Sequence, residues 1–373
     1  MVIDLLDTLF PHDIPAEISL TESQILSTPF GLDRTPLGRS TSKDRPVLSN
    51  AFALQELEVA LDKTSVSPAA ASTKDSQLDD LAHDEYFHIR RVANDNPAIF
   101  IRTAIKARII ILKEVLYAPV TLSHRKLDLI DRALADLAAC LVGGYVNGGS
   151  YVTLWECRGV QRHAMPRWIR GHQAFAALTQ GLIFSFRQLG EALRTGDSHQ
   201  VRRWADLCVV LFRGSAATFE LTGDFPVEDY ANVVRPSMMP PASEVGLSGL
   251  MSVDHRYLVQ LMRDMRPALK SLGEQEPAIH GDLAASLGEV YDSHIHVCER
   301  FVGARPSILT AGRTERSGPS LIEQFKSLRL KPFEQVVRAQ RLSRDPLLAE
   351  THSKDPRGSD PHQKRVGGCP FHE

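Results

Sequence analysis

A histidine and a cysteine lie one helical turn apart in residues 281–302, which read GDLAASLGEVYDSHIHVCERFV. At 3.6 residues per turn, the apolar positions of this segment form one stripe. His294 and Cys298 lie on that stripe, whereas His296 lies well round the helix. Four residues rise about 6 Å, which is comparable to the distance from a haem iron to the vinyl edge of its macrocycle. The pair could therefore bind haem, with His294 as an axial ligand and Cys298 in a single thioether.

Two other interpretations of this pair are open at this point. A histidine and a cysteine on an apolar stripe are more often core residues, because free cysteine is among the most buried residue types. Zinc is a further candidate ligand, but the remaining ligands that it needs do not occur at a recognisable spacing. The order His-x-x-x-Cys also differs from the C-x-x-C-H attachment signal of c-type haem. Taken alone, this helix favours the core interpretation.

A second histidine, His255, begins the amphipathic segment SVDHRYLVQLMRDMRPAL, in which Ser252 is the expected N-cap. His255 shares its helix face with leucine and methionine side chains. The stretch between His255 and His294 is long enough for one antiparallel helical return. Two histidines on neighbouring apolar faces could clamp a flat cofactor, although either could instead be a core histidine bonded to a carbonyl group.

The elements that would position these residues are predicted to be helices, which makes the chain all-α. Apolar residues recur three and four positions apart in residues 98–117, 122–142, 172–194, 197–221, 254–270, 281–302 and 320–342. Proline, serine and threonine are frequent near the N-terminus, and proline, glycine and charged residues near the C-terminus. We expect an extended N-terminal arm and linker over residues 1–76, a helical catalytic domain over 77–343 and a flexible tail over 344–373.

Composition excludes several classes of partner. A net charge of −2 gives no reason to expect nucleic acid or an anionic membrane, and charged residues interrupt the best candidate for a membrane span, residues 127–142. The five cysteines are widely spaced, and no secretory signal precedes them. We therefore expect a cytoplasmic protein. The arginines of residues 158–170 (RGVQRHAMPRWIR) are expected to form a solvated face, with haem propionates as the alternative.

Three colinear stretches resemble the tryptophan 2,3-dioxygenase superfamily of helical haem enzymes. Residues 83–89 (HDEYFHI) resemble the opening of its first core helix, and residues 226–243 resemble its P-x-x-[DE]-F…R…P-A-S segment. Residues 294–303 resemble the helix that supplies the proximal histidine, and residues 317–320 (SGPS) lie where the family has a glycine-rich loop. The resemblance covers roughly residues 80–325. It implies a tryptophan/indoleamine dioxygenase-like helical bundle around a haem.

Departures from that pattern narrow the resemblance. The family's distal histidine is expected where this chain has Val92, and the chain instead carries His255 and Cys298. Together with His294, this order is similar to the haem-dependent 3-methyl-L-tyrosine hydroxylases of saframycin-type antibiotic pathways. That resemblance implies His294 as the anchored axial ligand, Cys298 as the single thioether site and His255 as the opposite iron ligand.

The resemblance also implies roles on the substrate side. Arg235 matches the arginine that binds the substrate carboxylate, which suits a guanidinium group, although an interhelical salt bridge is the alternative. Tyr230 and His88 match positions that line the aromatic pocket, and either could instead be a packing residue. Ser243 and the loop Ser317–Ser320 match groups near the haem propionates and the substrate ammonium group. We expect Ser243 and Ser317 to contact the haem and Ser320 the substrate.

The function predicted from this resemblance is a haem-dependent monooxygenase of antibiotic biosynthesis that converts 3-methyl-L-tyrosine to a catechol. Its expected partners are the aromatic amino acid, dioxygen or peroxide, a small-molecule reductant and further copies of itself in a homo-oligomer. An iron with two histidine ligands has no open site, so we expect His255 to leave during the reaction. The alternatives are a ring-cleaving tryptophan-type dioxygenase, a non-catalytic bis-histidine haem protein and a helical interaction protein without a cofactor.

Overall fold

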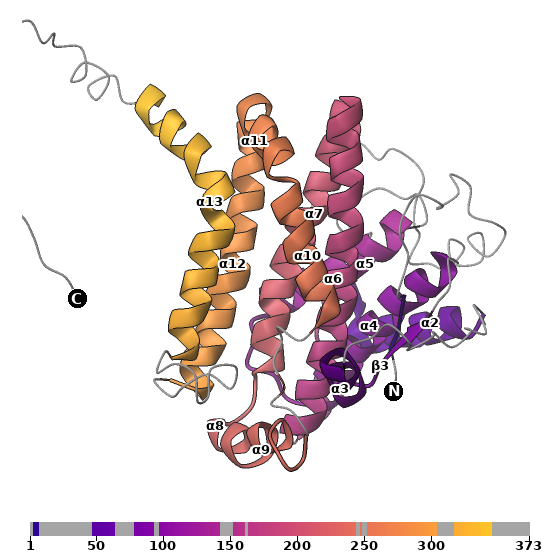
Figure 1. Ribbon diagram of the computed structural model, residues 1–373. Coiled ribbons are helices and arrows are strands. Elements are labelled where there is room, and N and C mark those ends of the chain that lie inside the picture. Colours follow the sequence, from indigo (N-terminus) through magenta and orange to yellow (C-terminus); the bar gives the residue numbers. More distant parts are fainter. Residues whose placement is uncertain are drawn as a thin grey trace, which may run out of the picture.

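The computed structural model describes residues 3–6, 47–63, 78–92, 97–141, 152–160, 163–243, 247, 252–303 and 317–344 (Figure 1). Helices dominate these residues. The strands among them form two short parallel pairs, β1 (Ile3–Leu6) with β3 (Ile89–Val92) and β2 (Val47–Ser49) with β4 (Val152–Leu154). The all-α prediction is therefore confirmed.

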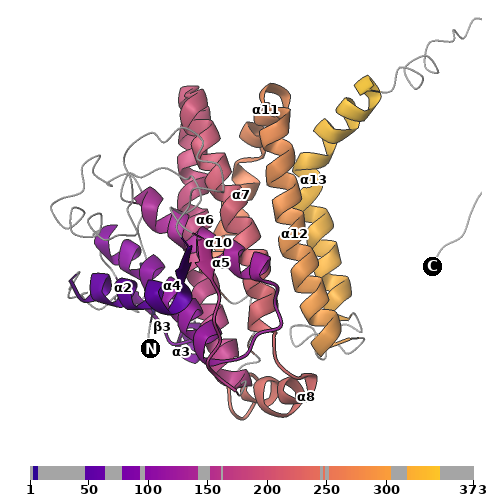
Figure 2. The same cartoon turned by 180° about the vertical axis from the view of Figure 1, so that it is seen from behind.

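Long helices that run side by side form the body of the molecule (Figures 1 and 2). They are α6 (Ala164–Thr195), α7 (Ser198–Thr222), α12 (Pro277–Phe301) and α13 (Gly318–Arg344), with α10 (Val253–Asp264) and α11 (Arg266–Gln275) beside them. Helix α7 packs against α6, against α12 and against α5 (His124–Leu141). It therefore lies at the centre of the bundle.

A tight turn and a close helix contact explain this arrangement. Gly196 ends α6 with a φ of 71°, a left-handed conformation that glycine adopts without steric cost. Asp197 then caps α7, because its side chain accepts a hydrogen bond of 3.0 Å from the backbone N–H of Gln200. On α7, a Cβ added at Gly214 would lie 2.3 Å from the Cβ of Ala133. Glycine at this position therefore allows α5 to pack closely on α7.

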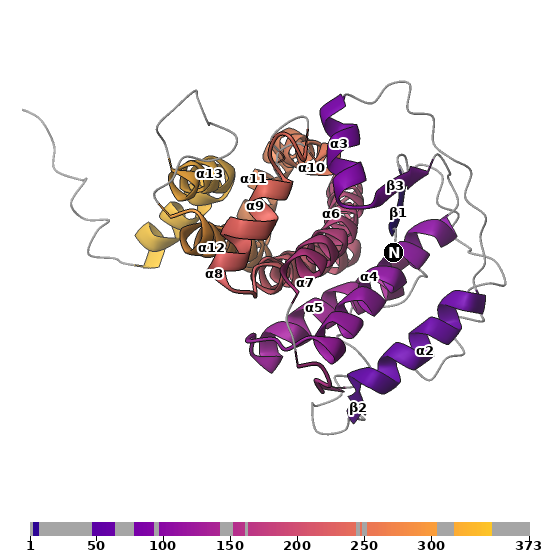
Figure 3. The same cartoon turned by 90° about the horizontal axis from the view of Figure 1, so that it is seen from below.

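The predicted N-terminal arm needs a correction. Residues Asn50–Lys63 of that arm form helix α2, which packs against α4 (Pro97–Tyr117) on the outer side of the bundle (Figure 3). Its inner face buries Ala53, Leu54 and Leu57, which recur at helical spacing. Burial of this apolar face outweighs the proline-rich character of the preceding residues. Most of the rest of the predicted arm, and nearly all of the predicted tail 344–373, lie outside the described residues.

Short helical pieces lie across the lower end of the bundle (Figures 1 and 3). They are α8 (Val227–Asp229), the π-helical turn η3 (Tyr230–Val234) and α9 (Arg235–Ser237). A small apolar cluster that contains Phe225, Tyr230 and Phe301 joins them to the end of α12. No helix within the described ranges has the length and apolar character needed to cross a membrane.

Candidate functional site

A cavity of about 300 Å³ opens among the helices of the bundle, with a wall built mainly of apolar and aromatic side chains. Its lining comes from α6, α7, α10, α12, α13 and α3 (Leu78–Tyr86), and from the short pieces at the lower end. Five predicted site residues lie on this wall: Tyr230, Arg235, His255, His294 and Cys298. The fold thus brings together side chains that are far apart in the sequence.

Helix α12 places His294 and Cys298 on the same wall, whereas His296 is exposed, as the helical spacing predicts. The imidazole of His294 stacks on Phe219 of α7, with ring centroids 4.6 Å apart and an interplanar angle of 11°. Burial, followed by the neighbouring His255, lowers the pKa of His294 to about 4. Burial raises the pKa of Cys298 to about 11. At neutral pH this wall therefore presents a neutral imidazole and a protonated thiol.

His255 faces the same cavity from the first turn of α10. Its backbone N–H donates to Oγ of Ser252 across 3.4 Å, so Ser252 is the N-cap that the sequence predicts. Burial lowers the pKa of His255 to about 4, with smaller contributions from Arg329 and Arg256. Within the described residues, its buried Nδ1 has no hydrogen-bond partner. Both histidines are thus neutral, which is the form that binds a metal ion.

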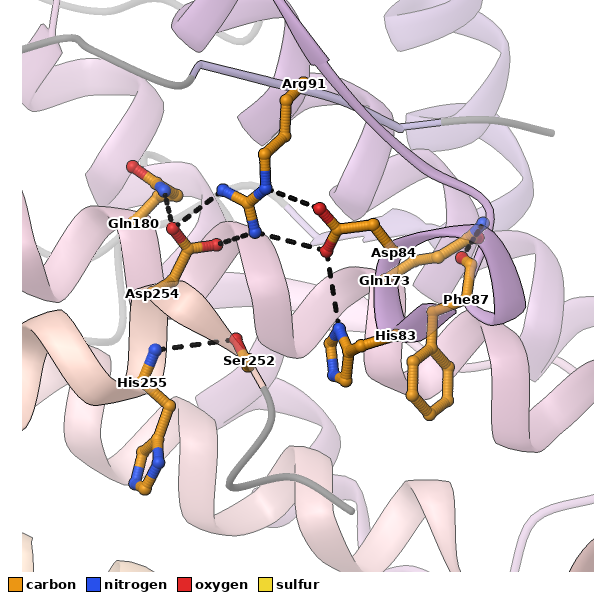
Figure 4. Close-up of polar contacts among 9 residues, drawn as sticks. All are labelled: His83, Asp84, Phe87, Arg91, Gln173, Gln180, Ser252, Asp254 and His255. Carbon is orange, nitrogen blue, oxygen red and sulfur yellow. Dashed lines mark hydrogen bonds and ion pairs between the residues drawn. The ribbon is translucent and has the colours of Figure 1, made fainter. Parts of the chain in front are cut away.

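Behind the cavity wall, a row of ion pairs joins α10 to strand β3 and helix α3 (Figure 4). Arg91 of β3 contacts Asp254 of α10 on one side and Asp84 of α3 on the other. Burial alone would raise the pKa of Asp84, but its contacts with His83 and Arg91 outweigh burial and lower it. Both carboxylates are buried. Asp84 therefore stays ionised beside Arg91.

Several aromatic residues of the wall were not identified from the sequence. His172 stacks on Phe87 with centroids 4.1 Å apart, and Trp168 lies 4.4 Å from His172 and 5.9 Å from Tyr230. Burial lowers the pKa of His172 to about 3, although its Nδ1 contacts the carbonyl oxygen of Trp168 at 2.8 Å. The i, i+4 spacing of Trp168 and His172 on one helix is the sequence signal that could have found them.

Tyr230 and Arg235 lie at the two ends of the π-helical turn η3, a type of turn that often marks functional sites. The Tyr230 ring stacks on Phe301 at 4.5 Å. Burial raises the pKa of Tyr230, and the charge of Arg235, together with a hydrogen bond to its side chain, partly offsets this effect. The guanidinium group of Arg235 is thus held at the cavity wall beside a phenol.

The remaining predicted residues lie elsewhere. His88 is exposed with a φ of 53°, and it lines a separate cavity of about 500 Å³. It follows the end of α3, so the left-handed turn directs it away from the face on which His83 reaches the main cavity. Ser243 does not line that cavity. Ser317 accepts a hydrogen bond of 3.4 Å from the backbone N–H of Ser320 at the start of α13, where the neighbouring Gly318 reaches the wall.

The arginine-rich stretch 158–170 also needs a correction. Arg167 is fully buried and pairs with Glu114 at 2.8 Å and Asp224 at 3.3 Å. The exposed Arg170 contacts the same Glu114 at 2.8 Å. These arginines form ion pairs with two buried carboxylates. The stretch therefore supports the fold rather than forming a purely solvated face.

Comparison with known proteins identifies the family of this chain. Residues 10–280 match the family described as SfmD 3-methyl-L-tyrosine peroxygenase. The chain belongs to this family. The resemblance to 3-methyl-L-tyrosine hydroxylases is therefore confirmed. The matched residues include His255 and Arg235, whereas His294 and Cys298 lie beyond them.

One relative and one solved structure illustrate this similarity. The chain is 36% identical over 172 residues to a 3-methyl-L-tyrosine peroxygenase from Streptomyces lavendulae. The alignment covers 46% of this chain and 47% of the relative, so the chain spans about half the length of the curated relative that it matches. A crystal structure of reduced SfmD, soaked with sodium hydrosulfite, has a similar fold, with a TM-score of 0.61 and 24% identity. That similarity covers 74% of this chain and 90% of the other.

Proposed function

We propose that this chain is a haem-dependent enzyme that hydroxylates the ring of 3-methyl-L-tyrosine, or of a close tyrosine derivative, to a catechol. The observation that carries this proposal is the pair of neutral, desolvated histidines, His255 and His294, on the wall of one apolar cavity. Family membership supports the reaction class. The name of the Streptomyces relative supports 3-methyl-L-tyrosine as the substrate and a peroxide as the oxidant.

The side chains of the cavity fit a haem. Its wall is mainly apolar, as a macrocycle requires, and the unpaired buried Nδ1 of His255 fits an imidazole whose usual partner is a ligand. Among the described residues, no group of three or more histidine, cysteine, aspartate or glutamate side chains could hold a bare metal ion. This favours a macrocycle with axial histidines over the zinc alternative. We assign His294 and His255 to the iron and Cys298 to a single thioether with a vinyl group.

The chain supplies position and electrostatics, and the haem supplies the oxidation when it is bound. Arg235 is assigned to the substrate carboxylate, because a guanidinium group can bind both carboxylate oxygens. The rings of Trp168, His172 and Tyr230 offer an aromatic surface for the substrate ring. Gly318 lines the cavity at the start of α13, and the neighbouring Ser317 and Ser320 are assigned to the haem propionates and the substrate ammonium group.

A further cavity residue, His83, is suited to hold a proton. Its Nδ1 lies 3.3 Å from Oδ1 of Asp84, and its ring lies on the cavity wall. A carboxylate on Nδ1 orients an imidazole, which leaves Nε2 to exchange a proton with the substrate. We assign to Nε2 of His83 the proton of the substrate phenol.

His255 is the ligand assigned to leave. It lies in the first turn of α10, and the N-terminal end of a helix disfavours a cationic imidazole, which keeps His255 neutral. Substrate that enters on this side would compete with His255 for its place at the cavity wall. Access to the haem would then depend on the presence of substrate.

A titration of the purified haem protein tests this function. We expect a six-coordinate absorption spectrum that changes when 3-methyl-L-tyrosine is added, and a product one oxygen atom heavier after peroxide is supplied. A ring-opened product from tryptophan would support the dioxygenase alternative. A spectrum that does not respond to any aromatic amino acid would support a non-catalytic bis-histidine protein. Absence of haem after reconstitution would overturn the proposal.

A further inference from the structure

Arg91 lies outside the cavity and bridges two buried carboxylates. Its Nε lies 2.5 Å from Oδ2 of Asp84, and a second nitrogen lies 3.2 Å from Oδ1 of the same residue. On the other side, two guanidinium nitrogens each lie 3.0 Å from the Asp254 carboxylate. Figure 4 shows the guanidinium group between the two acids. The pairing is bidentate on both sides, the geometry in which arginine binds carboxylates most strongly.

Each of these carboxylates adjoins a histidine of the cavity wall. Asp254 directly precedes His255 in the first turn of α10, and Asp84 directly follows His83 on α3. The rings of both histidines line the cavity and lie on the same side of the ion pairs in Figure 4. The bridge therefore joins two polar positions of the wall that come from distant parts of the sequence.

The start of α10 is also held by the Ser252 cap and by a contact with α6, against which this helix packs. The Ser252 cap is a long contact of 3.4 Å, and α10 has only 12 residues. Besides Arg91, Gln180 of α6 donates a hydrogen bond of 2.6 Å to Asp254. Since Asp254 is buried, loss of the bidentate contacts with Arg91 would leave its carboxylate with the hydrogen bond from Gln180, a deficit that a shift of the helix start or uptake of a proton would relieve.

We propose that Arg91 is a positioning residue that holds the first turn of α10, through Asp254, so that His255 faces the cavity. Through Asp84 the same guanidinium group fixes the neighbouring wall that carries His83. This inference rests on the proposed function in one respect, because His255 is assigned there as an iron ligand.

Arg91→Lys in the full-length chain tests the proposal, because an ammonium group keeps the charge but cannot bind two carboxylates in a bidentate manner. In the haem protein without substrate, we expect the six-coordinate species to be replaced largely by a five-coordinate one, with six-coordination restored by free imidazole. In the apoprotein, we expect amide hydrogen exchange in residues 253–258 to be about tenfold faster, in line with loss of a charge-assisted hydrogen bond.

Arg108→Lys is the matched control. Arg108 also forms a buried bidentate pair, with contacts of 2.6 and 3.0 Å to Asp131, but neither residue lines the cavity. We expect this variant to lose thermal stability while its spectrum and the exchange of residues 253–258 stay unchanged. Wild-type ligation and exchange in Arg91→Lys, or equal changes in both variants, would overturn the proposal. The hydrogen-exchange measurement tests the role of Arg91 even if the wild type binds no haem. Failure of the wild type to bind haem would instead overturn the proposed function.

Discussion

Helices α12 and α10 face the same cavity but hold their histidines in different ways. His294 lies in the second half of a 25-residue helix that packs against α7 and α13, and its ring stacks on Phe219. His255 lies in the first turn of a 12-residue helix, and its support comes from ion pairs behind the wall. His294 is thus fixed within the packed bundle, whereas His255 lies at the start of a short helix, which can shift more easily. Under the proposed function, we therefore expect the α12 side to anchor the cofactor and the α10 side to respond to substrate.

Loss of the α12 ligand should have the largest effect. We expect His294→Ala to lower catechol formation more than about 100-fold, because even the outer partners of a metal ligand change affinity by 10 to 100-fold. The measurement is product formation together with haem content after gel filtration. His296→Ala is the control, because this histidine is exposed on the same helix. Similar losses in both variants would contradict the anchoring role of His294.

Loss of the α10 ligand should open the iron without releasing the cofactor. We expect His255→Ala to keep its haem and to show a five-coordinate spectrum in the absence of substrate. His280→Ala, which alters a buried histidine packed on Phe333 away from the cavity, should keep the wild-type spectrum. A six-coordinate spectrum in the His255 variant would mean that another protein group can take its place, and the comparison between the two helices would then fail.

The proposed thioether of Cys298 gives a further test of the difference between α12 and α10, because it would attach the haem covalently to α12 and not to α10. After denaturation in acidic organic solvent, we expect the mass of the wild-type chain to include one haem, and that of Cys298→Ala to lack it. Cys157→Ala changes an exposed cysteine and should behave as the wild type. Free extraction of all haem from the wild type would exclude the linkage but would leave the axial ligands untouched.

Arg235 tests a part of the cavity wall that comes from α9 and not from the two helices that carry the histidines. We expect Arg235→Ala to weaken binding of the amino acid by about 10 to 100-fold, the usual range for loss of a hydrogen bond to a charged group. Haem content should stay normal. A spectral titration with the amino acid and with its decarboxylated amine measures this role. Equal affinity of the wild type for both compounds would rule out carboxylate binding.

Acidification should lower the stability of the apoprotein through both histidines, and this effect is smaller than those above. Because the pKa of each is lowered from 6.5 to about 4, the unfolded chain takes up protons first as the pH falls. The contribution of these two histidines to the free energy of unfolding is fully present above pH 6.5 and is lost as the pH falls toward 4. We expect each histidine to contribute a loss of about 1 kcal/mol between pH 6.5 and 5.5. Denaturant unfolding at several pH values measures this slope, which His255→Gln and His294→Gln should each reduce.

Local pattern was sufficient for some parts of the site and insufficient for others. The apolar stripe places His294 and Cys298 correctly, and Ser252 caps α10 as expected, because both depend on neighbours within one helix. The i, i+4 spacing could have placed Trp168 and His172 on one helix face, but the stacking of His172 on Phe87 could not be predicted, because it depends on the packing of α6 against the α3 region. Burial of Arg167 likewise depends on Glu114 and Asp224, which come from other parts of the chain.

The bridge through Arg91 could not be predicted from the sequence for the same reason. No local pattern connects Arg91 with Asp254, because 163 positions separate them in the sequence. Resemblance to a family supplied Arg235 and Tyr230, which periodicity alone would have treated as ordinary packing residues. The role of His88 was transferred from a family motif without knowledge of the backbone. A left-handed turn after α3 places this residue at a different cavity.

The π-helical turn between Tyr230 and Arg235 accommodates one extra residue while it keeps two side chains of the cavity wall on one side. The backbone N–H of Arg235 donates to the carbonyl oxygen of Tyr230, five residues earlier, so the two side chains leave the backbone on one side. In a regular α-helix, residues five apart point about 140° away from each other. Deletion of one residue from Ala231–Val234 would leave the two positions four residues apart, where an α-helix separates them by only about 40°. A chain one residue shorter in this turn can therefore keep the phenol and the guanidinium group on one side in an ordinary α-helical turn.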